Sequence, residues 1–200
     1  MKNKHIVRHE GHVTAADRAL LLGQLPATVW FTGLSGAGKS TLAFALEHRL
    51  VDIGRACYVL DGDNVRHGLN KNLGFSHEDR TENIRRIAEV AKLMNDAGLI
   101  VIAAFISPYL GDREMARQII GEDKFIEIHV CTPLTICEER DTKGMYKMAK
   151  EGKIAAFTGV SAPYEPPFSA ALTLDTSTLD IAACIGLITG VLSPHIDKRG

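Results

Sequence analysis

Long apolar stretches are absent from this sequence of 200 residues. The longest uninterrupted apolar run, residues 99–106, falls well short of the roughly 20 residues that a membrane-spanning helix needs. The polar start of the chain, MKNKHIVRHEGH, does not contain the apolar core of a secretory signal. We therefore expect a cytoplasmic protein that does not associate with membranes.

An excess of charge of one sign is also missing, because 23 Lys and Arg residues face 24 Asp and Glu residues. The formal net charge of −1 gives no general attraction for nucleic acid or for anionic surfaces, so any site for a polyanion has to be local. Cysteine is scarce too, and Cys57, Cys131, Cys137 and Cys184 contain no C-x-x-C pair. The cysteines therefore give no sign of a zinc knuckle or a disulfide framework.

Residues 33–40 read GLSGAGKS and fit the pattern G-x-x-x-x-G-K-[ST]. In this pattern backbone N–H groups surround phosphate oxygens, the lysine reaches the β- and γ-phosphates, and the hydroxyl binds Mg²⁺. The β-rich stretch 27–32 and the apolar periodicity of 40–50 place a strand before the loop and a helix after it. A glycine-rich connection without chemical meaning would not require Gly38-Lys39-Ser40 at such a junction. The pattern therefore predicts a nucleoside triphosphate site.

Strands and helices alternate along the rest of the predicted chain. The other strands are expected at 56–60, 99–106, 125–130 and 170–174. The other helices are expected at 15–22, 76–98, 112–120, 133–139 and 179–192. This alternation predicts an α/β fold with a parallel sheet and right-handed crossovers. We expect an N-terminal arm and short helix over 1–25 and one domain over 26–200, with a lysine-rich lid at about 140–157.

A phosphate loop alone does not distinguish a kinase from a GTPase switch or from an ATP-driven machine or binding module. A switch should carry a guanine-reading N-K-x-D, but the nearest string, NKNL at 70–73, lacks the aspartate. A machine would usually have an apolar strand ending in acidic residues beside the loop strand, whereas the run 99–106 is followed by Ser107. Small size and the lysine-rich segment favour a kinase whose lid closes over the transferred phosphate.

The acceptor of such a kinase would meet residues that follow the second strand. Arg80 and Asn83 are three residues apart and share one face of a helix. Together with Arg66 and Phe75 they would present two guanidinium groups, an amide and a ring to a planar, anionic molecule. From the spacing alone, a solvated charged surface is an equal alternative.

Several blocks of the sequence together resemble the adenylylsulfate kinase family. They are HEGHVTAADRALLLGQ at the start, GLSGAGKS, DGDNVRHGLN, FSHEDRTENIRR, FISPY and TKGMYKMAKEGKIAAFTGVSAPYEPP, and the likeness runs from about residue 5 to residue 192. Members are P-loop kinases, three-layer sandwiches with a central five-stranded parallel sheet, and usually homodimers. They phosphorylate the 3′-hydroxyl of adenosine 5′-phosphosulfate (APS) in sulfate assimilation. The resemblance implies ATP as donor, Mg²⁺ as cofactor, and 3′-phosphoadenylyl sulfate (PAPS) and ADP as products.

The resemblance also divides the expected site between the two substrates. The ATP side consists of Gly33, Leu34, Ser35, Gly36, Ala37, Gly38, Lys39, Ser40, Thr41 and Arg140. The APS side consists of Asp63, Arg66, Phe75, Arg80, Asn83, Ile106, Ser107, Lys143, Gly144 and Phe157. Phe75 and Phe157 would sandwich the adenine of APS, and Arg66, Arg80 and Asn83 would hold its phosphosulfate.

The resemblance implies four candidates for the chemistry, namely Lys39, Asp61, Asp63 and Ser107. Asp63 would orient or deprotonate the acceptor hydroxyl, whereas Asp61 would contact Mg²⁺ through water and Ser40 would bind the ion directly. Both aspartates are expected to end the same strand, with at most one directed at the acceptor.

Ser107 matches a serine that is described in the family as a phosphoserine intermediate. We expect it to contact APS instead, because direct in-line transfer needs only positioning and charge stabilisation and no base neighbours it in the sequence.

The nearest alternative function is a kinase for another small acceptor, such as a nucleoside, gluconate or shikimate. A nucleotide-binding regulator without an acceptor is the alternative that is not an enzyme.

Overall fold

The computed structural model describes residues 7, 9, 11–141 and 143–197 of the chain. The expected N-terminal arm falls partly outside these residues, as does Thr142 of the expected lid. The strands are β1 (Thr28–Thr32), β2 (Cys57–Asp61), β3 (Ile100–Ala104), β4 (Phe125–Val130) and β5 (Leu172–Leu174). The helices are α1 (Ala15–Leu22), α2 (Lys39–Asp52), α3 (His77–Asp96), α4 (Leu110–Ile120), α5 (Leu134–Arg140), α6 (Met145–Lys150) and α7 (Ile181–Ile196), with a 3₁₀ turn η1 (Asn64–His67).

The strands form one parallel sheet in the order β2-β3-β1-β4-β5. The central strand β1 pairs with β3 on one side and with β4 on the other. All residues of β1 and β3 are buried, as expected for strands whose two faces are both covered. The loop after β1 therefore leaves the sheet where the strand order reverses, which is where open α/β sheets bind ligands.

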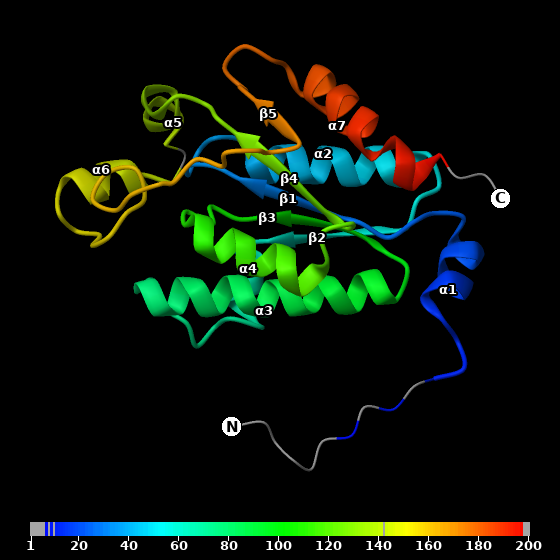
Figure 1. Ribbon diagram of the computed structural model, residues 1–200. Helices are drawn as coiled ribbons and strands as arrows, with labels where there is room; N and C mark the ends of the chain where they lie inside the picture. Colours follow the sequence, from blue (N-terminus) through cyan, green and yellow to red (C-terminus); the bar gives the residue numbers. More distant parts are fainter. Residues whose placement is uncertain (1–6, 8, 10, 142, 198–200) are drawn as a thin grey trace.

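Helices cover both faces of this sheet (Figure 1). Helices α2 and α7 lie on one face, where Leu46 and Ile188 belong to one buried cluster. Helices α3 and α4 lie on the other, where Ile87 and Ala116 share a second cluster with Trp30 of β1. The fold is thus the three-layer α/β sandwich that the sequence predicts.

The ends of the sheet are occupied by different elements. Figure 1 shows α5 and α6 beside the edge at which the strands end, and α1 near the opposite edge, on the side where α7 ends. The short helix α1 is where the sequence predicts it, and Thr14 caps it with a capping box that includes Asp17. The expected lid therefore lies at the ligand-binding edge of the sheet.

Most elements differ from their predicted bounds by one or two residues at an end, as β5 does by beginning at Leu172. Three differences concern the site or the chain end. Residues 145–150 of the expected lid are helical, because the Asp141 carboxylate accepts the first N–H groups of α6, from Tyr146 and Lys147, at 3.1 Å each. Strand β3 ends at Ala104, before the predicted limit of 106. Helix α7 continues past its predicted end at 192 and contains Pro194 in its last turn. Among the described residues, no helix has both the length and the apolar character needed to cross a membrane.

Candidate active site

The loop that joins β1 to α2 requires glycine at two positions for steric reasons. Gly33 has φ +150°, and a Cβ there would lie 2.4 Å from the carbonyl oxygen of Val130. Gly36 has φ +75°, and its Cβ would lie 2.9 Å from the carbonyl oxygen of Cys137. Helix α2 begins directly after the loop, and no side chain caps it at Gly38. Its first N–H groups and the positive end of its dipole are therefore available to an anion.

Lys39 is held against the backbone of the same loop. Its Nζ donates a 2.7 Å hydrogen bond to the carbonyl of Leu34, and the residue is buried. Burial lowers the pKa of this ammonium group to about 8, while the charges of Asp61 and Asp63 act in the opposite direction. The lysine is therefore placed beside the N-terminus of α2, where its charge would add to that of the helix dipole.

Ser40 and Asp61 bring a hydroxyl and a carboxylate together from neighbouring elements. The Ser40 Oγ donates to Asp61 Oδ2 at 2.7 Å. The other carboxylate oxygen of Asp61 accepts the backbone N–H groups of Asp63 and Asn64, at 3.0 and 3.3 Å. Asp61 is 6 % exposed, and these three hydrogen bonds fix the orientation of its carboxylate. Two hard oxygen ligands therefore stand side by side at the base of the phosphate loop.

The prediction that Asp61 and Asp63 end one strand was wrong. Strand β2 ends at Asp61, and Asp63 lies beyond Gly62, immediately before the turn η1. The Asp63 carboxylate is 67 % exposed and forms an ion pair with Lys143 of the lid. The two carboxylates diverge because the chain leaves the strand at Gly62, and of the two it is Asp61 that contacts Ser40.

Arg66 and Phe75 form the outer part of the expected acceptor side. The guanidinium carbon of Arg66 lies 4.3 Å from the centre of the Phe75 ring. Its Nη1 donates to the carbonyls of Leu73 and Gly74 at 3.1 Å each. Partial burial lowers the pKa of Arg66, and the nearby charge of Arg80 acts in the same direction. Phe75 itself is 60 % exposed, so one face of its ring remains open to a planar partner.

Arg80 joins helix α3 to the far end of the lid. Its Nε donates to the carbonyl of Phe75 at 3.0 Å. Its Nη2 and Nη1 donate to the carbonyl of Ala156 and the hydroxyl of Thr158, at 2.6 and 2.8 Å. These two acceptors flank Phe157, so Arg80 fixes the backbone around that ring.

Asn83 lies one helical turn beyond Arg80 and is buried. Its Oδ1 accepts a 2.9 Å hydrogen bond from the amide Nδ2 of Asn70. Within the described part of the chain its own Nδ2 has no hydrogen-bond partner. The Asn83 amide therefore has donors to offer an acceptor anion.

Ser107 occupies a strained position in the turn after β3. Its φ is +38°, which is uncommon outside glycine, and the residue is 3 % exposed. Its Oγ accepts a 3.2 Å hydrogen bond from the indole N–H of Trp30. Neighbouring Ile106 uses its carbonyl to accept the Thr32 hydroxyl at 2.8 Å, so this turn is tied to the strand before the phosphate loop.

The lid contacts the phosphate loop through Tyr146, whose hydroxyl donates to the carbonyl of Ser35 at 2.9 Å. The Tyr146 ring meets the buried ring of Phe157 edge to face, with centroids 5.0 Å apart. Burial raises the pKa of the Tyr146 hydroxyl, which therefore remains a donor. Arg140, at the end of α5, donates to the hydroxyl and carbonyl of Thr176 at 2.7 and 2.8 Å.

These side chains surround one cavity of about 1810 Å³. A sequence profile of the family described as "Adenylylsulphate kinase" matches residues 25–175, which is most of the chain. The chain belongs to the adenylylsulphate kinase family. The family resemblance expected from the sequence motifs is therefore confirmed.

Individual relatives agree with this adenylylsulphate kinase assignment. The chain is 58 % identical over 189 residues to the adenylyl-sulfate kinase of Shewanella sp. (strain MR-7), covering 94 % of this chain and 92 % of the relative. The structure of the Mycobacterium tuberculosis APS kinase CysC with AMPPNP and APS superposes with a TM-score of 0.82 at 44 % identity, over 85 % of this chain and 99 % of that one. The hexameric APS kinase of Thiobacillus denitrificans gives a TM-score of 0.66 at 37 % identity, over 88 % of this chain and 30 % of that one.

Most of the residues predicted for this adenylylsulphate kinase site line the cavity. From the ATP side these are Ser35, Gly36, Gly38, Lys39, Ser40, Thr41 and Arg140, and Asp61 joins them. From the APS side they are Asp63, Arg66, Phe75, Arg80, Asn83, Ile106, Ser107, Lys143 and Phe157. The structure does not bring Gly33, Leu34, Ala37 and Gly144 to the cavity wall. The two expected substrate sides therefore open into the same space.

The sequence motifs of the adenylylsulphate kinase family did not point to Thr176, which also lines the cavity. Its hydroxyl donates to the carbonyl of Ala37 at 2.9 Å and accepts from Arg140, so it links the phosphate loop to α5. A signal was present, because Thr176 follows the last strand and parallel strands end at one edge of the sheet.

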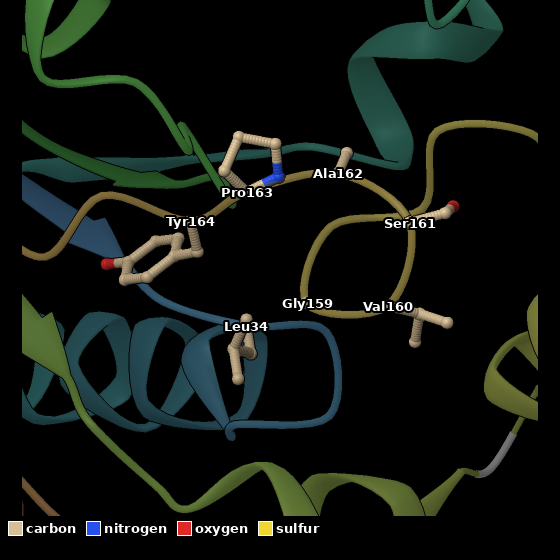
Figure 2. Close-up of a pocket in the computed structure, with 7 residues that line it drawn as sticks. All are labelled: Leu34, Gly159, Val160, Ser161, Ala162, Pro163 and Tyr164. Atoms are coloured by element: carbon tan, nitrogen blue, oxygen red, sulfur yellow. The ribbon is translucent and has the colours of Figure 1, made fainter.

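A second hollow, of about 580 Å³, lies between the phosphate loop and the segment 159–164. Figure 2 shows Leu34 across from Gly159, with Pro163 and Tyr164 along the rim. A Cβ at Gly159 would lie 3.0 Å from the Leu34 side chain, so the two segments are in close contact. Leu34 therefore lines this hollow and not the main cavity.

Proposed function

We propose that this chain transfers the γ-phosphoryl group of ATP to the 3′-hydroxyl of APS, giving PAPS and ADP, as in sulfate assimilation. The observation that carries the proposal is the single 1810 Å³ cavity, in which the phosphate loop and the acceptor-side residues face the same space. Similarity to the M. tuberculosis enzyme, whose structure contains both APS and AMPPNP, supports the pair of substrates.

ATP would place its phosphates against the loop 33–40 and the first turn of α2. The free N–H groups of that turn and the ammonium of Lys39 would stabilise the negative charge of the γ-phosphoryl group as its bond loosens. Arg140 lines the same side of the cavity and would contact the nucleotide, with its fork held by Thr176.

The donor set of Ser40 and Asp61 fits Mg²⁺, because a hydroxyl and a carboxylate lie 2.7 Å apart and this ion prefers oxygen ligands. Ser40 would hold the ion directly and Asp61 would contact it through water. When bound with ATP, Mg²⁺ supplies positive charge to the β- and γ-phosphate oxygens.

APS would lie between helix α3 and the lid. The exposed face of Phe75 and the ring of Phe157 would contact the adenine, and Arg66, Arg80 and Asn83 would hold the phosphosulfate. Lys143 and Gly144, which belong to the lid, would close over the bound APS. Asp63 lines this part of the cavity and would orient or deprotonate the 3′-hydroxyl once Lys143 turns to the substrate.

Closure of the lid would also exclude water from the γ-phosphoryl group. The contact of Tyr146 with Ser35 already ties α6 to the phosphate loop, and Arg80 ties the end of the lid to α3. With water excluded, the acceptor hydroxyl is the nucleophile and ATP hydrolysis is suppressed.

The deciding experiment incubates the protein with Mg-ATP and APS and identifies the product by mass. We expect a product one phosphoryl group heavier than APS, together with an equal amount of ADP. Gluconate, shikimate and a nucleoside serve as competing acceptors in parallel reactions. Faster ADP release with one of these acceptors would identify that acceptor, and not APS, as the substrate. ATP binding without acceptor-dependent ADP release would favour a nucleotide-binding regulator.

We also propose that copies of the chain form a homodimer and that the protein is cytoplasmic. The hexameric APS kinase of Thiobacillus denitrificans, which is similar to this chain, supports association of copies. Sedimentation velocity would give the mass of the assembly, with a dimer as the expected result and a single 21.8 kDa species as the contrary one. Cell fractionation would test the location.

A further inference from the structure

Arg113 of helix α4 is the most deeply buried charged side chain near the acceptor side of the cavity, and the chemistry proposed above does not use it. The residue is 2 % exposed. Its Nε donates to Glu127 Oε1 of β4 at 2.7 Å, so the positive charge is paired. Burying such a pair costs solvation that its mutual attraction barely offsets, so the pair alone does not explain why an arginine is placed there.

The other two nitrogens of this guanidinium group hold backbone. Nη1 donates to the carbonyl of Ser107 at 2.7 Å, and Nη2 donates to the carbonyl of Glu165 at 2.7 Å. One planar fork therefore joins the turn after β3 to the segment that follows the lid. A lysine could neutralise Glu127 but could not make three divergent hydrogen bonds in fixed directions.

The first of these contacts bears on the conformation of Ser107. A serine at φ +38° keeps that backbone only where its surroundings fix it. Here the carbonyl is fixed by Arg113 and also accepts the Thr32 hydroxyl at 3.3 Å, while the side chain accepts the N–H of Trp30. Removing the guanidinium fork would allow the turn to relax and would redirect the Ser107 hydroxyl.

The second contact bears on the opposite wall of the acceptor side. Glu165 is also tied to the turn after β3, since its N–H donates to the Pro108 carbonyl at 2.8 Å and its carboxylate accepts the Leu110 N–H at 2.7 Å. The same segment begins at Phe157 and Thr158, which line the cavity, and Thr158 receives Arg80. The spacing between the two walls thus depends on contacts that converge on Arg113.

We infer that Arg113 is a positioning residue for the acceptor. It fixes the position of the Ser107 turn relative to the segment that begins at Phe157, on the APS side of the cavity. The inference rests on the proposed function only for the identity of the acceptor. It predicts that Arg113 affects the binding of APS and hardly affects the binding of ATP, because within the described residues none of its hydrogen bonds reaches the phosphate loop.

Arg113→Lys is the central test, because it retains the positive charge opposite Glu127 and removes the fork. We expect the KM for APS to rise about tenfold, with the KM for ATP changed by less than about twofold. Arg117→Lys is the matched control, since Arg117 lies on the same helix and contacts the same Glu127, at 3.3 Å, without a hydrogen bond to Ser107 or Glu165. The control should leave both KM values within about twofold of those of the unchanged protein.

A second variant covers the case in which Arg113→Lys does not fold. Arg113→Met combined with Glu127→Met replaces the buried pair by apolar side chains, a change that often preserves the fold. We expect this double variant to melt cooperatively and to show the same selective rise in the KM for APS. A folded double variant with an unchanged KM for APS would overturn the inference.

Trp30 offers a readout that does not depend on turnover. It is the only tryptophan in the chain, and its indole N–H donates to Ser107. We expect the emission of the ligand-free protein to shift in Arg113→Lys and to stay unchanged in Arg117→Lys. Equal spectra for the two variants would overturn the positioning role, whereas a shifted spectrum in a protein that does not phosphorylate APS would support that role and refute only the proposed substrate.

Discussion

Ser40 and Asp61 are 21 residues apart in the chain, yet the Ser40 hydroxyl donates a 2.7 Å hydrogen bond to the Asp61 carboxylate. The contact exists because β2 ends at Asp61 on the same edge of the sheet from which α2 begins. Asp63, only two positions further along, instead pairs with Lys143 of the lid. This difference gives the two carboxylates distinct expected roles.

Asp61→Asn should lower turnover by about 10²-fold or more and raise the Mg²⁺ concentration needed for half-maximal rate. The amide oxygen can still accept the N–H groups of Asp63 and Asn64, so the melting temperature should change little. Turnover measured across a Mg²⁺ titration checks this. An unchanged Mg²⁺ requirement would remove Asp61 from the metal site.

Asp63→Asn should lower kcat by roughly 10²–10⁴-fold with small effects on the binding of either substrate. The loose transition state of phosphoryl transfer would place the loss toward the lower end, since little proton transfer is needed early. Lys143→Met breaks the same ion pair and leaves the carboxylate, so as a comparison it should raise the KM for APS and leave kcat nearly unchanged. If Lys143→Met lost as much kcat as Asp63→Asn, the base would not be Asp63.

Lys39 should make ATP binding take up a proton in alkaline solution. Its pKa in the folded protein is about 8, below the ordinary value of 10.5, because burial disfavours the charged form. Between these two values the unfolded chain binds more protons than the folded one, so the free energy of unfolding of the ligand-free protein rises with pH as the cost of burying the charged lysine is lost. Phosphate binding favours the protonated form and reverses the shift.

Calorimetry in buffers of different ionisation enthalpy would measure this uptake. We expect about one proton taken up per ATP bound at pH 9 and close to none at pH 7. Lys39→Met should abolish the uptake and nearly abolish turnover, with a loss of at least 10²–10³-fold. Proton uptake that persists in Lys39→Met would assign it to another group.

Arg80→Ala should raise the KM for APS about ten- to a hundredfold with little change for ATP, because charge-assisted hydrogen bonds on the acceptor side are lost. It should also increase cleavage of the lid by proteases, since the contacts to Ala156 and Thr158 disappear. Arg85→Ala is the matched control on the same helix, as among the described residues Arg85 pairs only with the partly exposed Glu82 and Glu89. A rise in the KM for ATP instead, with the KM for APS unchanged, would show that Arg80 belongs to the ATP side of the site.

Ser107→Ala should retain turnover within about tenfold, because within the described residues its hydroxyl contacts Trp30 and the Phe105 carbonyl and no base. Emission from Trp30 should change, since the indole loses its acceptor. Rapid quenching with labelled ATP would test for a covalent intermediate. A phosphoserine at this position that forms and decays at the rate of turnover would restore the two-step route.

Local patterns in the sequence determined the fold class and the phosphate loop. The loop is recognisable because Gly33, Gly36 and Gly38 are required by backbone conformations and Lys39 and Ser40 by phosphate and metal chemistry, all within one short stretch. The strands and helices were predictable because apolar residues repeat with the period of the element that buries them. Helix α6 was missed although its buried residues, Tyr146 and Ala149, have helical spacing, since its lysines indicated an exposed lid.

Tertiary structure alone decided which of the recognised side chains meet. Arg80 contacts residues 76 and 78 positions away, and no local pattern could have assigned its donors to Ala156 and Thr158. Sequence reasoning likewise gave Arg113 no role, because its three acceptors lie on separate segments that only the packed sheet brings within reach of one guanidinium group. Periodicity specifies which face of an element is buried, whereas the partners across that face depend on the strand order and on the loops that end at one edge of the sheet.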